Sequence, residues 1–75
     1  MASLNTETKH DRGFEITWLN PPLMSHEWSA NVASNDPALM RLVQLSPSNG
    51  IIAGPTRDAM LINVKLYIDG LLTKG

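Results

Sequence analysis

The stretch from Gly54 to Gly75, GPTRDAMLINVKLYIDGLLTKG, decides the fold. Thr56 predicts a helix N-cap, because its hydroxyl can accept a hydrogen bond from a free amide of the first turn, and Asp58 suits the positive end of the helix dipole. Pro55 keeps Gly54 extended, which marks a strand-to-helix boundary. At 100° per residue the large apolar side chains fall on one continuous face: Met60, Leu61, Val64, Tyr67, Ile68, Leu71 and Leu72. That face must cover an apolar surface.

Strands with one apolar side supply such a surface. Residues 14–19, FEITWL, alternate at period two, with Phe14, Ile16 and Trp18 on one side. Residues 26–34, HEWSANVAS, alternate again, with Trp28, Ala30 and Val32 on one side. A helix capped by Ser25 is the competing interpretation of this second stretch. A third, short strand is expected over residues 50–53.

The segment 37–45, PALMRLVQL, has two interpretations. Asp36 followed by Pro37 is typical of an N-cap and first helical position, which favours a short extra helix or an irregular crossing. Alternatively, residues 39–45 form a strand that pairs with residues 50–54. Residues 46–50 form a turn in either case.

These elements predict one α+β domain over residues 13–75: a small antiparallel sheet of about three strands, in the order strand-strand-strand-helix, covered by one long C-terminal helix. A chain of 75 residues holds one domain at most. Residues 1–12 are polar and without periodicity, so we expect them to form a flexible N-terminal tail.

Composition excludes several classes of protein. With no cysteines, disulfides and thiolate metal sites are impossible. Six basic and seven acidic side chains give a formal net charge of -1, without the basic patch of a typical nucleic-acid binder. No apolar run approaches the roughly 20 residues that span a bilayer, and the N-terminus lacks the apolar core of a signal peptide. We therefore expect a cytoplasmic protein that binds neither membranes nor nucleic acid.

The residues that usually carry catalysis do not form a recognisable site. The two histidines, His10 and His26, fall in the expected tail and at a strand start. The carboxylates are scattered, the serines lack a neighbouring base, and no glycine motif matches a phosphate-binding loop. The sequence therefore predicts no enzyme activity, no metal site and no cofactor.

Ala59, Ile62 and Leu66 form a second apolar stripe on the back of the long helix, and Gly70 continues it at the next turn. A helix that only covers a sheet should be polar there, so the stripe predicts a contact surface. The alternative is that segment 37–45 folds over the stripe within the same chain. We favour an interface, because a domain this small gains burial by dimerising.

The Gly-x-Thr-Arg-Asp-Ala junction of residues 54–59, and the stretch WSANV at 28–32, resemble the HicB-like antitoxin domain. The resemblance spans roughly residues 13–73 and implies a protein-binding, oligomerising domain without DNA recognition of its own. Together with the stripe, it predicts a small non-enzymatic interaction module, antitoxin-like or regulatory, that forms a homodimer and has a second protein as a further candidate partner. The alternative function is a single-stranded nucleic-acid-binding domain that stacks bases on Trp18 and Trp28.

Overall fold

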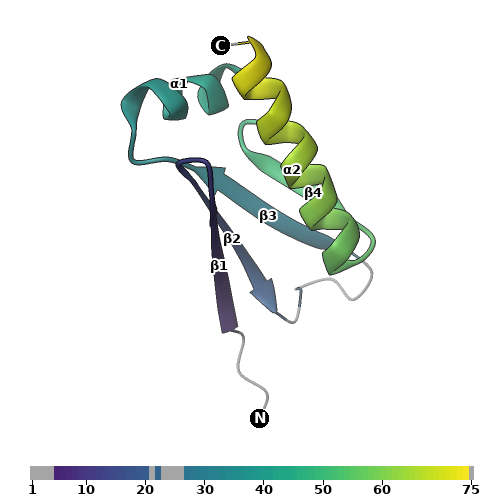
Figure 1. Cartoon of the computed structure of the whole chain (residues 1–75). Helices are drawn as coiled ribbons and strands as arrows, with labels where there is room; N and C mark the ends of the chain where they lie inside the picture. Colours follow the sequence, from purple (N-terminus) through teal and green to yellow (C-terminus); the bar gives the residue numbers. More distant parts are fainter. Residues whose placement is uncertain (1–4, 21, 23–26, 75) are drawn as a thin grey trace.

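The computed structural model describes residues 5–20, 22 and 27–74. Over these residues the chain forms a four-stranded antiparallel sheet and two helices (Figure 1). The elements in chain order are β1 (Asn5–Asp11), β2 (Phe14–Asn20), β3 (Trp28–Ala33), α1 (Pro37–Leu45), β4 (Ile51–Gly54) and α2 (Arg57–Lys74). The sheet order is β1-β2-β3-β4, so strands adjacent in sequence are adjacent in space. The predicted α+β class and C-terminal helix are confirmed, with one strand more than expected.

The additional strand is β1, and the prediction of a flexible tail is wrong for residues 5–11. Arg12 and Gly13 have φ values of 50° and 89°, which is the geometry of a two-residue type I′ hairpin turn. From this turn β1 pairs with β2, from Asp11↔Phe14 to Asn5↔Asn20. Backbone pairing with β2 orders a polar segment that has no apolar alternation of its own. Residues 1–4 lie outside the described residues.

The two faces of the sheet differ sharply in burial. Phe14, Ile16 and Trp18 of β2, with Ala30 and Val32 of β3, are buried on the face that the helices cover. The opposite face, which includes Glu15, Ser29 and Asn31, is exposed. The predicted alternation of both strands is therefore confirmed, while the competing cap at Ser25 lies outside the described residues.

Helix α2 lies across the β3–β4 side of the sheet (Figure 1). It contributes four buried side chains to the core: Met60, Val64, Ile68 and Leu71. Leu61 and Tyr67 are partly buried at the edges of this face. The prediction that Leu72 belongs to the core face is wrong, because this residue is 37% exposed. It lies at the edge of the apolar face of α2.

Segment 37–45 is the helix α1, and the alternative in which it pairs with β4 as a strand is wrong, since β4 pairs with β3. The Asp36 carboxylate accepts a hydrogen bond from the Ala38 amide at 2.9 Å, and Pro37 occupies the first turn, as predicted. Val43 is fully buried in the core. The Ser46 hydroxyl, just after the helix, shares a hydrogen bond with the Tyr67 hydroxyl of α2.

The junction between β4 and α2 has the predicted cap. Thr56 Oγ1 accepts a hydrogen bond from the Ala59 amide at 3.1 Å. One turn further, the Asn63 side-chain amide donates to the Ala53 carbonyl at 2.9 Å, so the helix also satisfies a backbone group of the edge strand β4. Gly54 permits this close approach, because a Cβ there would lie 2.5 Å from the Met60 nitrogen.

Candidate interaction surface

The predicted stripe lies on the side of α2 that faces away from the sheet. Ile62 is 60% exposed and Leu66 is 62% exposed, although both are large aliphatic residues. Ala59 is partly exposed at the first turn, and Gly70 is exposed at the far end. A Cβ added to Gly70 would meet no atom within 4 Å, so the space beside it is open. We call Ala59, Ile62 and Leu66 the α2 stripe.

Segment 37–45 does not cover the α2 stripe, so that alternative is wrong. The C-terminal end of α1 reaches the last turns of α2, where Leu42, Leu45 and Leu71 line a hollow of about 210 Å³. Val43 faces the core there. Helix α1 therefore packs at the end of the molecule through Val43 while its Leu45 is 72% exposed, and Ile62 and Leu66 also remain exposed.

The flank of the stripe toward β1 is a mixed apolar and charged hollow of about 210 Å³. Leu61 and Ile62 contribute apolar surface from α2, and the charged residues Lys9, Asp11 and Lys65 also line the hollow. Arg12, in the hairpin turn, forms ion pairs with Asp11 and Asp69 and so connects the sheet to the helix. These carboxylates, Asp11 above all, raise the pKa of the Arg12 guanidinium above its ordinary value.

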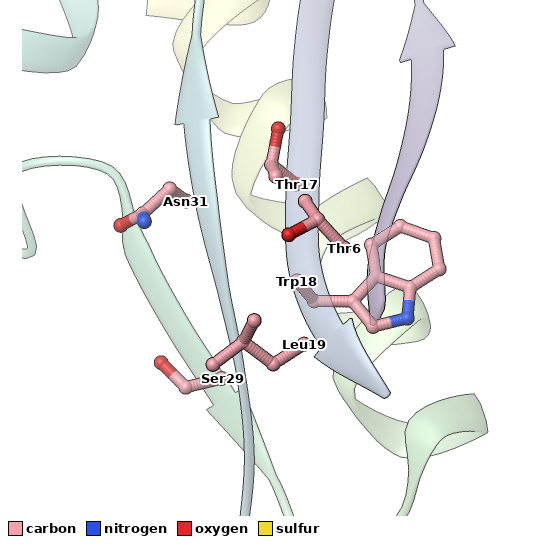
Figure 2. A pocket seen from close by; sticks show the side chains of 6 residues that line it. All are labelled: Thr6, Thr17, Trp18, Leu19, Ser29 and Asn31. Carbon is pink, nitrogen blue, oxygen red and sulfur yellow. The ribbon is translucent and has the colours of Figure 1, made fainter. Parts of the chain in front are cut away.

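A second accessible region is the open face of the sheet, on the side opposite α2 (Figure 2). A hollow of about 290 Å³ lies there, lined by the open-face residues Thr6, Thr17, Leu19, Ser29 and Asn31 and also by Trp18 of β2, whose side chain belongs to the covered face. Its polar side chains are hydroxyls and one amide, which can exchange hydrogen bonds but cannot serve as general acids or bases near neutral pH. Sequence reasoning missed this region because Thr6 was assigned to a tail. The alternation of threonines before the Arg12-Gly13 turn is the signal that could have found it.

The residues considered for catalysis and metal binding are dispersed. His10 lies on β1 with its side chain 73% exposed and its Nε2 atom 3.4 Å from Glu15 Oε2, whereas His26 lies outside the described residues. Among the residues that the structure describes, no group of three or more His, Cys, Asp or Glu residues could hold a metal ion. Within the same part of the chain, no helix has the length and apolar character needed to cross a membrane.

The two tryptophans do not form an exposed platform for bases. Both lie on the helix-covered face of the sheet, because Trp18 pairs with the buried Ala30 and Trp28 pairs with Gly54. Trp18 is 8% exposed, and its indole nitrogen donates a hydrogen bond to Glu7. Trp28 is partly buried against the same core. Stacking on single-stranded nucleic acid requires open indole faces, which this arrangement does not offer.

Comparisons of the chain with protein-family models, with curated proteins and with solved structures find no significant match.

Proposed function

We propose that this chain is a small non-enzymatic protein-interaction module that self-associates through the α2 stripe, with α2 of a second copy as the occupant. The observation that carries the proposal is the exposure of Ile62 and Leu66, at 60% and 62%, on the side of α2 opposite the core. Burying such aliphatic side chains against a partner contributes roughly 1.5–3 kcal/mol for each one fully covered.

The surroundings of the stripe favour a helix as the partner. Ala59 and Gly70 are small residues at its two ends, so the backbone of a second helix can approach closely there. Lys65 and Asp69 flank the stripe with one charge of each sign, so neither sign alone repels an identical copy. A self-complementary patch of this kind suits a two-fold symmetric dimer.

The HicB-like resemblance of residues 54–59 extends the proposal to a regulatory, antitoxin-like role. In that role the self-associated domain binds a second protein. The support is the capped strand-to-helix junction at Thr56, where β4 leads into α2. The cytoplasm is the proposed location.

The double substitution Ile62→Glu, Leu66→Lys tests self-association. The two new side chains are spaced i,i+4, so they support the helix itself while placing charges on the stripe. We expect the unsubstituted chain to sediment as a dimer or larger at tens of micromolar, and the double variant to stay folded, to lose the contact through the α2 stripe and to sediment as a smaller species. The conservative variant Ile62→Leu, Leu66→Ile keeps the apolar surface and should sediment like the unsubstituted chain.

An unsubstituted chain that stays monomeric at high concentration would rule out self-association through the stripe. If the charged variant unfolds instead, the thermal midpoint of the unsubstituted chain decides the matter. A midpoint that rises with protein concentration indicates that folding and dimerisation are coupled, as in an obligate dimer. A midpoint independent of concentration, together with an unfolded variant, contradicts the proposal.

A further inference from the structure

The outer edge of β1 offers a row of backbone groups that pair with no other strand in the described part of the chain. β1 is at one end of the sheet and pairs with β2 alone. In a two-residue hairpin, the pair that closes the turn, Asp11↔Phe14, exchanges both backbone hydrogen bonds, and such pairs then alternate along the ladder. The residues between them direct their N–H and C=O groups away from β2. These residues are Thr6, Thr8 and His10, and all three are exposed.

The side chains of β1 divide between the two faces of the sheet. Glu7 and Lys9 pair with the buried residues Trp18 and Ile16, so they lie on the helix-covered side. Thr6, Thr8 and His10 lie on the open side. The edge strand therefore carries opposite charges, two residues apart, on one face.

We propose that β1 pairs in antiparallel orientation with β1 of a second copy of this chain, about a two-fold axis at Thr8, and so joins two four-stranded sheets into one. In this register Thr8 faces Thr8 of the second copy, and Thr6 faces His10 of the second copy. These are the residues whose backbone groups face away from β2, so each of them gains a strand partner.

Charge selects this register over its neighbours. With the axis at Thr8, Glu7 faces Lys9 of the second copy, and the same pair forms again on the other side of the axis. A shift of the axis to Glu7 would bring two glutamates face to face, and a shift to Lys9 would bring two lysines face to face. Like charges directly opposite destabilise a strand pair, whereas opposite charges stabilise it. Registers centred on Thr6 or His10 leave most of the unpaired groups without partners.

The contacts of Glu7 prepare it for this pairing. Glu7 Oε1 accepts a hydrogen bond from the Trp18 indole at 2.7 Å and lies 3.9 Å from an Arg57 nitrogen, which holds the carboxylate over the covered face. Lys9 makes no ion pair with any residue in the described part of the chain. An unrelated apolar strand would leave the Lys9 amino group without a counter-charge, which is a common way for edge strands to exclude wrong partners. A second copy supplies that counter-charge.

This edge contact goes beyond the proposed function and does not depend on it. The two-fold axis is perpendicular to the joined sheet, so both copies place α2 on the same face, with the covered sides of the two β1 strands between the helices. Within the α2 stripe, Ile62 lines the hollow that also contains Lys9 of β1, whereas Leu66 does not line it, so a charge placed at Leu66 alone affects the stripe without facing β1. The two surfaces can therefore be tested separately.

Cysteine substitutions report the register directly, because the chain contains no cysteine. Thr8→Cys places two sulfur-bearing residues opposite each other with their Cα atoms about 5.5 Å apart. That distance falls inside the range of roughly 4.4–6.8 Å that disulfides tolerate. Mild oxidation of the purified full chain should convert Thr8→Cys into a covalent dimer on a non-reducing gel.

Thr6→Cys is the matched control, on the same strand and the same face. In the proposed register the two substituted residues are four positions apart, about 13 Å along the strands, and should not cross-link. Adding His10→Cys to Thr6→Cys restores facing cysteines, so the double variant should cross-link between chains. The same pattern should appear in a Leu66→Lys background, because Leu66 lies outside the hollow that contains Lys9.

Lys9→Glu tests the charge pairing, with Lys9→Arg as its control. In Lys9→Glu a second carboxylate faces Glu7 of the other copy. We therefore expect the dissociation constant of the edge contact to rise about tenfold or more, and the yield of Thr8→Cys cross-links to fall. Lys9→Arg should leave both unchanged. Equal cross-linking of Thr6→Cys and Thr8→Cys would overturn the register. Absence of cross-links in Thr8→Cys, with circular dichroism showing a folded chain, would overturn the edge contact.

Discussion

The indole nitrogen of Trp18 donates a 2.7 Å hydrogen bond to Glu7, and this contact ties the buried face of β2 to the polar edge strand β1. It gives an inward-facing carboxylate a specific partner at the margin of the core. Edge strands commonly carry inward-facing charges that discourage pairing with unrelated strands. In this chain the charge also satisfies a tryptophan N–H that is largely removed from water.

Removing the acceptor should weaken the fold. We expect Glu7→Ala to lower the free energy of unfolding by about 1–3 kcal/mol, because the Trp18 N–H loses its partner in a largely buried site. Glu7→Gln keeps an acceptor and should cost less. Urea denaturation of both variants, with and without Trp18→Phe, measures the coupling. If Glu7→Ala costs as much in the Trp18→Phe background, the hydrogen bond contributes nothing to stability.

The two tryptophans should differ in their contribution to folding. Trp18→Ala is expected to cost about 3–5 kcal/mol, because the indole is almost fully enclosed. Trp28→Ala should cost less, because part of its indole surface already contacts water in the folded chain. Chemical denaturation followed by circular dichroism compares the two. A larger loss for Trp28→Ala would contradict the burial of the two side chains.

The sequence predicts most of the fold because burial and backbone geometry agree in β2, β3 and α2. Period-two alternation in residues 14–19 and 28–32, and helical periodicity after Thr56, both arise from one-sided burial. β1 was missed for a physical reason. Its residues contribute little apolar surface, so its order depends on backbone pairing with β2 and on the Arg12-Gly13 turn, neither of which hydrophobic periodicity reports.

The α2 stripe could be placed on the outer side of the helix from angular position alone. Whether α1 covers it could not be decided, because the short apolar run 39–45 fits a helix or a strand equally well. The structure places α1 at the last turns of α2. The free edge of β1 was invisible at the sequence level, since its existence depends on a strand that was itself missed.

The cap of α2 offers a test at one exposed residue. Thr56→Ala should destabilise the chain by about 1 kcal/mol, because the Ala59 amide loses its acceptor. Thr56→Ser keeps a hydroxyl at the same place and should be near neutral. Thermal unfolding of the two variants gives the comparison. Losses of the same size in both would show that the Thr56 methyl group, rather than the cap, matters.

Two glycines of the same segment should respond to alanine in opposite directions. At Gly54 the new Cβ would lie 2.5 Å from the nitrogen and 2.8 Å from the Cα of Met60, and both are backbone atoms that cannot rotate away. The first turn of α2 would have to move off β4, so we expect Gly54→Ala to cost several kcal/mol and to unfold much of this small domain.

Gly70 is the matched position within α2, where a Cβ meets no atom within 4 Å. Gly70→Ala should raise the free energy of unfolding by about 0.5–1 kcal/mol, because alanine loses less backbone entropy than glycine on entering a helix. The thermal midpoints of the two variants, measured in the Ile62→Glu, Leu66→Lys background so that helix packing through the α2 stripe does not contribute, should therefore move to opposite sides of that of the same background with both glycines. A Gly54→Ala variant as stable as the unsubstituted chain would show that β4 and α2 leave room for a Cβ at residue 54. That result would contradict the 2.5 Å distance between this Cβ position and the Met60 nitrogen.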